Sequence, residues 1–333
     1  MKRFLLTLAM VCVLAGMSAG NIYAEGVAIN QKNFPDDLLR STVAENQWNR
    51  DGKLEKNEIK DVTKMKLNLV QELYSDSENN SVDMTKNYSV INCKGLEYFD
   101  NLKELYLSVS GIDAKEYRYR KRNLKNFHQV YRLKKIEKLT VLGDNTKKVW
   151  KFNQFPKLTT LKIGGGMTGT IRLGKNLKNL YIVGLEEADT LRSDDGLRGK
   201  STLNLSKADK LRKFYAEGLY TNVKFGNNKN LRKINISNTG TEKNVKIKTL
   251  NFKGLKNVNS IEISGCNRLK NVKLGNHKKL KRISICSKAL KEIDVKGCKA
   301  LRIISVYRNT KVKNLGKGYH ITKSKGTVTY QKK

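Results

Sequence analysis

The sequence predicts an α/β solenoid, a coil of short parallel strands with a small helical cap at its N-terminal end. From residue 269 to residue 306 an apolar-x-apolar pair recurs every ten or eleven residues, as in Ile283/Ile285 and Ile293/Val295, and a leucine stands three residues before each pair. Alternation over so few positions indicates a brief strand with one buried side, and its regular recurrence indicates stacked coils. One unit cannot bury its apolar edge alone, so neighbouring units must stack.

Residues 1–24 have the features of a secretory signal peptide. Lys2 and Arg3 precede the apolar run FLLTLAMVCVLAG, and a cleavage site is expected at Ala24. The run is shorter than the ~20 apolar residues that a membrane span needs. We therefore expect a secreted or extracellular protein without a transmembrane segment, which its basic repeats could hold noncovalently on an anionic surface.

Residues 25–90 are expected to form a helical cap and a connection. A helix is predicted from Asp36, and the loop QWNRDGKLEKNE that follows it matches most of the calcium loop of an EF-hand. The candidate ligands fall at the first, third, fifth, seventh and twelfth positions of that pattern: Gln47, Asn49, Asp51, Lys53 and Glu58. Gln47 stands where the pattern has an aspartate, which removes one anionic oxygen. Two interpretations remain open, a weak calcium site and a cap that keeps the loop for folding.

The strand ladder is expected from residue 91 to residue 310, followed by a capping strand and tail from 311 to 333. Near its two ends the ladder contains KGLEYFDNLKELYL and LKEIDVKGCKALRIISV. Together with the EF-hand-like segment, these stretches resemble the secreted leucine-rich-repeat proteins of Gram-positive bacteria, over nearly the whole chain after residue 24. The resemblance implies a leucine-rich-repeat fold. The asparagine that usually follows the strand is often absent here, as in LKRISICSK.

A basic insert interrupts the ladder near residues 115–132, where Leu124, Phe127 and Tyr131 have helical spacing. A helix is predicted on the side of the solenoid. Basic residues alternate with tyrosines at its start and could bind phosphates or sulfates, while the rings stack on bases or sugars. The alternative is a solvated helix face. The candidate ligand-binding residues are Arg118, Arg120, Lys121 and Arg122.

The middle residue of each apolar-x-apolar strand points away from the core. These positions are mostly neutral and include three tyrosines, Tyr106, Tyr181 and Tyr215. They are candidate ligand contacts on an outer sheet face, with cross-strand packing as the alternative role.

The charge of +37 is unevenly distributed. Residues 25–104 carry 11 basic and 15 acidic side chains, a net charge of −4, whereas residues 105–333 carry 54 and 15, a net charge of +39. Such a field favours anionic partners, for example teichoic acid, glycosaminoglycan, nucleic acid or an acidic protein. Charge alone does not choose among them.

Four cysteines follow the signal peptide, Cys93, Cys266, Cys286 and Cys298, too few for a disulfide scaffold in so long a chain. Cys266 and Cys286 are separated by about one coil. Their backbones could therefore stack at the ~4.8 Å strand spacing, within reach of a disulfide. The alternative is two small core residues in a ladder.

Chemistry typical of an enzyme is not evident in the sequence. Gly164, Gly166 and Gly169 fit GxGxxG, but a strand pattern follows them, so the helix N-terminus that would hold a dinucleotide phosphate is missing. We expect a binding protein and not an enzyme, with no cofactor other than calcium. Adhesion to a protein or glycan on a host or neighbouring cell is the expected function, and attachment to polyanions is the alternative.

Overall fold

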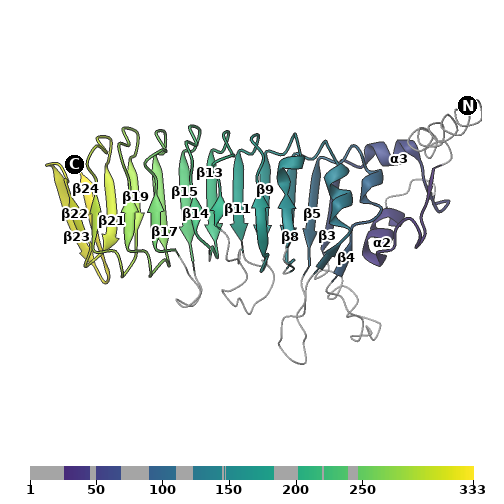
Figure 1. Ribbon diagram of the computed structural model, residues 1–333, viewed down its shortest axis with the longest axis horizontal. Coiled ribbons are helices and arrows are strands. Elements are labelled where there is room, and N and C mark those ends of the chain that lie inside the picture. Colours follow the sequence, from purple (N-terminus) through teal and green to yellow (C-terminus); the bar gives the residue numbers. More distant parts are fainter. Residues whose placement is uncertain are drawn as a thin grey trace, which may run out of the picture.

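The chain folds as a leucine-rich-repeat-type solenoid, as the sequence predicts (Figure 1). The computed structural model describes residues 26–45, 50–68, 90–109, 123–144, 146, 148–183, 202–219, 221–238 and 247–333. The helical cap lies at one end of an elongated coil and the C-terminus at the other. None of the helices in these ranges is long and apolar enough to cross a membrane.

One long sheet runs along the molecule. Its strands are five residues long in most coils and pair in parallel, except for an antiparallel hairpin at the C-terminal end. The order along the sheet is β3 (Lys64–Asn68), β5 (Glu104–Ser108), β7 (Lys138–Leu142), β9 (Thr160–Gly164), β11 (Asn179–Val183), β13 (Lys213–Glu217), β15 (Lys233–Ser237), β17 (Ser260–Ser264), β19 (Arg282–Ile285), β21 (Ile303–Tyr307), β24 (Thr327–Lys332) and β23 (Tyr319–Ser324).

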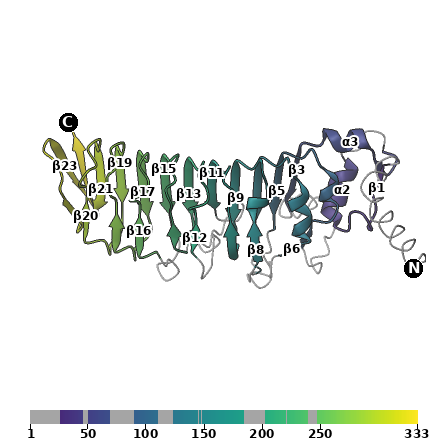
Figure 2. The ribbon, with the colours of Figure 1, turned by 45° about the horizontal axis from the view of Figure 1, so that its top comes forward.

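A second row of shorter strands lies on the other side of the coil and forms two-stranded parallel sheets (Figure 2). Half-repeats alternate between the two rows, so two units make one turn. The pairs are β4 (Val90–Asn92) with β6 (Asn123–Lys125), β8 (Lys148–Lys151) with β10 (Gly169–Arg172), β12 (Leu203–Asn204) with β14 (Val223–Lys224), β16 (Thr249–Asn251) with β18 (Asn271–Lys273), and β20 (Glu292–Asp294) with β22 (Lys311–Lys313).

The apolar residues of both rows meet in one continuous core. In its N-terminal half the core is aromatic. Trp150 is fully buried, and its Nε1–H donates a hydrogen bond of 2.9 Å to the carbonyl of Thr168. Its ring lies nearly parallel to that of Phe152, with 6.0 Å between the centroids, and meets the ring of Phe127 edge-on at 5.0 Å. Leucine, isoleucine and valine dominate the coils from β15 to β21. This packing fixes the strands that carry the outer face.

The N-terminal cap contains α2 (Asp37–Glu45) and α3 (Lys56–Asp61). Between them β2 (Lys53–Leu54) pairs antiparallel with β1 (Val27–Ala28). Glu55 and Glu58 form a capping box at the start of α3, in which the Glu58 carboxylate accepts the Glu55 N–H at 2.8 Å. The helix, loop and helix order matches the sequence expectation for this segment.

Three expectations differ from the structure. The long sheet begins at β3, before the expected start of the ladder at residue 91. In the described part of the basic insert, strand β6 and a 3₁₀ helix (Phe127–Arg132) replace the expected α-helix, because Leu124 lies in the strand and Asn126 turns the chain with φ of 52°. After β22, the C-terminal tail contributes two antiparallel strands to the long sheet instead of one.

All four described cysteines are free thiols, so Cys266 and Cys286 are not bridged. In the next coil the place of Cys266 is occupied by Ser287, 21 residues later. The carbonyl of Cys266 accepts the N–H of Leu269, and in the same way the carbonyl of Ser287 accepts the N–H of Leu290. Cys286 lies one position earlier and its side chain therefore has a different direction. Burial raises the pKa of the Cys266 thiol to about 11, which makes it unreactive at neutral pH.

The glycine-rich stretch after β9 is a turn. Gly165 and Gly166 have positive φ values and connect β9 to β10, and no helix follows. The dinucleotide interpretation is thereby excluded for this motif.

Candidate functional site

The middle residues of the long-sheet strands form one outward column in strict register. Tyr106 pairs with Thr140, Thr140 with Lys162, Lys162 with Tyr181, and Tyr181 with Tyr215. All five side chains are partly exposed. Tyr106 and Tyr181 lie three strands apart in the sheet. At ~4.8 Å for each strand spacing, the two aromatic positions are separated by about 14 Å.

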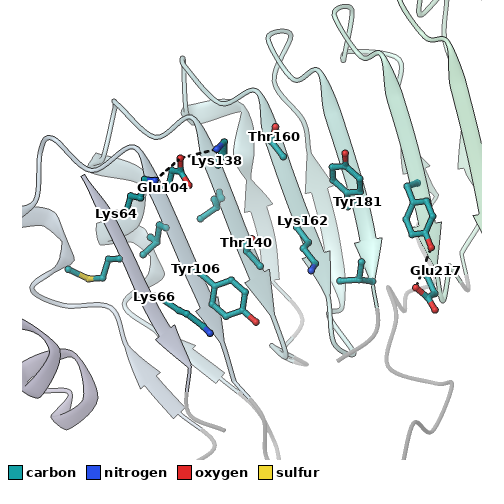
Figure 3. A pocket seen from close by; sticks show the side chains of 15 residues that line it. Lys64, Lys66, Glu104, Tyr106, Lys138, Thr140, Thr160, Lys162, Tyr181 and Glu217 are labelled. Carbon is teal, nitrogen blue, oxygen red and sulfur yellow. Dashed lines mark hydrogen bonds and ion pairs between the residues drawn. The ribbon is translucent and has the colours of Figure 1, made fainter. Parts of the chain in front are cut away.

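This part of the sheet face bounds a groove of about 830 Å³, which lies across the strands from β3 to β13 (Figure 3). We call it the tyrosine groove. Its lining residues are Lys64, Met65, Lys66, Glu104, Leu105, Tyr106, Lys138, Leu139, Thr140, Thr160, Lys162, Tyr181, Val183, Tyr215 and Glu217.

Glu104 joins two lysines at the upper rim of the groove (Figure 3). Its carboxylate lies 2.9 Å from the Lys138 ammonium and 3.9 Å from that of Lys64. The hydrogen bond from Lys138 lowers the pKa of Glu104, and the charges of both lysines act in the same direction. All three side chains are solvated, so the cluster is expected to contribute little to stability. It leaves an excess of positive charge at the rim.

Neighbouring side chains on the same sheet face contact the rings of Tyr106 and Tyr181. Lys66 lies over the Tyr106 ring, with Nζ 5.4 Å from its centroid. Tyr106 and Tyr181 pack against a small cluster of Leu142 and Val183, which is separate from the main core. Such packing restricts the rings to few orientations.

Tyr181 and Tyr215 form a tilted pair with centroids 6.3 Å apart. The Tyr215 hydroxyl donates a long hydrogen bond of 3.5 Å to the Glu217 carboxylate. Partial burial raises the pKa of Tyr215, and the charge of Glu217 and the hydrogen bond to it act in the same direction. The hydroxyl is therefore protonated at neutral pH and remains a donor.

The groove combines aromatic faces, hydroxyl groups and lysine ammonium groups on a rigid sheet. These groups suit recognition of a sugar or a protein side chain by stacking, hydrogen bonding and charge. In the part of the chain that the structure describes, no three His, Cys, Asp or Glu side chains are grouped so that they could hold a metal ion.

Sequence reasoning found the three tyrosines of the groove but missed its lysine and glutamate rim. Lys64 and Lys66 belong to β3, within residues 25–90, for which the sequence predicts a helical cap and a connection instead of a strand of the long sheet. The stretch VTKMKL at 62–67 has the spacing of the repeat, with Val62 and Met65 in leucine positions, and this signal could have identified the strand. The candidate residues Arg118, Arg120, Lys121 and Arg122 lie outside the described residues.

Two of the candidate calcium ligands, Gln47 and Asn49, also lie outside the described residues. Asp51 accepts the Lys53 N–H at 2.8 Å, Gly52 has a positive φ of 78°, and Glu58 caps α3. Asp51 and Glu58 supply the carboxylate oxygens that calcium prefers, and both also hydrogen-bond to nearby backbone. The residues present are thus compatible with a weak site.

Comparisons with known proteins add little to these observations. No protein-family model matches the chain, and no curated protein matches it. Among solved structures, the chain is similar to an internalin, InlF, from Listeria monocytogenes, with 11% identity and a TM-score of 0.26 over 87% of this chain and 98% of the other.

Proposed function

We propose that this chain is an extracellular binding protein and not an enzyme, and that the tyrosine groove is its recognition surface. The partner is a protein or glycan on a host or neighbouring cell, and the use is adhesion. The observation that carries this proposal is the in-register row of Tyr106, Lys162, Tyr181 and Tyr215 across the groove. The secretory features of residues 1–24 support the extracellular location.

The arrangement favours recognition over catalysis for a physical reason. Neighbouring coils hold the outward side chains at fixed spacing, so a ligand meets a surface that needs little ordering before it binds. Tyrosine contributes a large contact area and loses little side-chain entropy on binding. A ligand that spans about 14 Å can contact Tyr106 and Tyr181 together and reach Lys162 between them.

The alternative function is attachment to a polyanion through the basic residues of the repeats. Salt separates the two hypotheses. Charge-driven binding of a polyanion weakens steeply with ionic strength, whereas contacts through Tyr181 and Tyr215 depend weakly on it.

The test is a binding survey of the purified protein against glycans, matrix proteins, teichoic acids and nucleic acids at low and high salt. The expected result is one glycan or protein ligand retained at high salt. Its affinity should fall about 30-fold in Tyr181→Ala, corresponding to ~2 kcal/mol for a central aromatic contact. Tyr307→Ala is the matched control, because Tyr307 lies on the same sheet in β21 outside the groove. Equal losses in both variants would contradict the proposal.

A further inference from the structure

The turns that lead into the long-sheet strands repeat one geometry along the C-terminal half of the solenoid. In each turn a backbone N–H donates to the carbonyl three residues earlier, as Leu211 does to Ala208 at 3.1 Å and Leu301 to Cys298 at 3.1 Å. We call these segments the pre-strand turns. They comprise residues 174–179, 208–213, 228–233, 255–260, 277–282 and 298–303.

One position of the pre-strand turns stacks into a column of six residues, of which five are basic. The backbone N–H of Arg212 donates to the carbonyl of Lys178 at 2.7 Å, and that of Arg232 donates to Arg212 at 2.9 Å. Equivalent bonds follow in the next coils. Asn259 donates to Arg232, Lys281 to Asn259 and Arg302 to Lys281, each at 2.9 Å. Successive coils are ~4.8 Å apart, so the column extends about 24 Å along the solenoid axis.

We name this column the basic edge and define it as Lys178, Arg212, Arg232, Lys281 and Arg302. The pre-strand turns, which contain these residues, lie along the top of the molecule in Figure 1, above the strands from β11 to β21. The four residues after Lys178 are exposed. No ion pair joins any of the five to an acidic residue among the described parts of the chain.

The exposed charges within the six pre-strand turns are almost all positive. The six pre-strand turns contain a basic residue at most of their exposed positions, and Asp209 is the one acidic residue within them. In the N-terminal coils the corresponding turns carry Asp100, Glu104 and Glu137 among their lysines. Within the described turns, the excess of positive charge is therefore largest from residue 174 onward, where it concentrates counter-ions along a line.

The pre-strand turns also exclude some anionic ligands. None of the six contains Phe, Tyr or Trp, and the imidazole ring of His277 is buried, so no exposed ring is present on which bases or sugars could stack, as single-stranded nucleic-acid sites require. Duplex DNA is stiff over ~150 base pairs, and its phosphates wind around a helix instead of following a straight row. Arginine binds phosphate oxygens through two parallel N–H groups.

We propose that the basic edge binds a linear, flexible phosphodiester polymer, such as a polyol phosphate, laid along the solenoid axis. Its phosphates pair with Lys178, Arg212, Arg232, Lys281 and Arg302, and its rotatable backbone adapts their spacing to the repeat of the coil. This site is distinct from the tyrosine groove in residues and in ligand chemistry. The two together would allow the protein to be held on an anionic surface while its groove remains open to a partner.

The test compares two variants of the full chain that lose four positive charges each, from +37 to +33. The edge variant carries Arg212→Gln, Arg232→Gln, Lys281→Gln and Arg302→Gln. The control carries Lys151→Gln, Arg172→Gln, Lys224→Gln and Lys273→Gln, all exposed residues of the second row. Thermal melting establishes that both are folded.

The probe is poly(glycerol phosphate), with its dissociation constant measured between 50 and 300 mM salt. For a flexible chain each contact contributes about 0.7 to the slope of log K against log salt, so the edge variant should lose about 3 in slope while the control keeps the parent value. Equal losses in both variants would overturn the site. Tighter binding of heparin or duplex DNA than of poly(glycerol phosphate), with the same dependence on the edge, would overturn the ligand class.

Discussion

The N-terminal and C-terminal halves of the long sheet share one backbone ladder but present different side chains to solvent. Between β5 and β13 the outward column consists of tyrosine, threonine and lysine side chains around a groove. Between β15 and β21 the outward residues are Asn235, Glu262, Ser284 and Ser305, with no aromatic ring among them. Asn235 donates to the Glu262 carboxylate at 3.4 Å, and the hydroxyls of Ser305 and Thr329 lie 3.0 Å apart. The turns before β5 and β7 carry acids and bases together, whereas the pre-strand turns, from residue 174 onward, are almost purely basic.

The comparison shows how a solenoid can separate two kinds of recognition. The backbone bonds that stack the coils are independent of the outward side chains, so each coil can change its surface without changing its fold. The first half presents ring faces and balanced charges, which suit a discrete ligand. The basic edge begins at Lys178, shares the coils of β11 and β13 with the groove and continues to Arg302, and its line of charge suits a polymer.

Truncation of core side chains should produce the largest losses of stability, and it tests whether the two halves of the solenoid unfold separately. Trp150→Ala removes the aromatic centre of the N-terminal core, and Phe252→Ala removes a fully buried ring of the C-terminal core. Each should cost about 3–5 kcal/mol. Because coils contact only their neighbours, hydrogen exchange should show lost protection mainly in the half that carries the substitution. Uniform loss of protection along the chain would instead mean that the solenoid unfolds as one unit.

Two glycines provide a smaller, matched perturbation of each half. Gly143 has φ of +89°, and a Cβ there would lie 1.9 Å from the carbonyl oxygen of Val109. Gly265 has φ of +66°, and its Cβ would lie 1.6 Å from the carbonyl oxygen of Asn238. Alanine at either site must shift backbone and adopt a strained conformation, at about 1–3 kcal/mol.

Gly143→Ala should weaken ligand binding to the tyrosine groove more than polymer binding to the basic edge, and Gly265→Ala should do the reverse. Both affinities are measured on each variant after its melting temperature is known. If both variants impair both ligands equally, the two surfaces are coupled through the backbone.

A decrease in pH should change the folding stability in opposite directions at the two ends of the molecule. His277 in the C-terminal half is fully buried, and neither ring nitrogen has a hydrogen-bond partner. Burial lowers its pKa, against the opposing effect of the nearby carbonyls of Leu274, Leu255 and Phe252. The unfolded chain therefore binds the proton more readily, and stability falls as the pH decreases below the ordinary histidine pKa of ~6.5.

Asp36 in the N-terminal cap behaves in the opposite way. Burial raises the pKa of its carboxyl, although the backbone N–H groups of Asn92 and Leu39 donate to it at 2.7 and 3.0 Å. The folded state holds the proton more strongly here, so this contribution to stability is lost as the pH rises above ~4.

Hydrogen exchange at pH 5 and pH 7 checks the histidine effect, and His277→Asn supplies its control. Asn228 occupies the equivalent position two coils earlier and donates to the carbonyls of Leu205 and Ala208 at 2.9 and 3.0 Å. An asparagine at 277 should therefore satisfy the site without a titratable group. The difference in protection between the two pH values should disappear from the coils around residue 277, and its persistence would assign the acid effect to another group.

The outer face could be predicted because a period of two determines which side chains point outward. The period of two identifies Tyr106, Tyr181 and Tyr215 as outward residues, but their alignment in one row follows from the parallel pairing of the strands and not from the coil length, which varies. The basic edge could not be predicted as a line. Its alignment depends on backbone hydrogen bonds between coils, and the coils differ in length, as the 21-residue step from Cys266 to Ser287 shows.

The expected helix near residue 124 failed for a related reason. Leu124, Phe127 and Tyr131 have the spacing of one helical face, but a short strand followed by a 3₁₀ turn gives the same spacing. Periodicity over three residues does not distinguish the two, and only the pairing of β6 with β4 decides between them.

Calcium should produce the smallest effect and restrict it to the N-terminal cap. If the loop binds calcium with a dissociation constant near 1 mM, as weak extracellular sites do, 5 mM calcium stabilises the cap by about 1 kcal/mol. Asp51→Asn keeps an oxygen that can accept the Lys53 N–H but removes the carboxylate charge, so it should abolish the calcium effect and leave the turn intact. Calorimetry and hydrogen exchange with calcium, and with magnesium as control, measure both quantities. Absence of heat and of added protection in the parent protein would assign the loop a folding role alone, and the difference between the two halves of the solenoid would then rest on the groove and the basic edge.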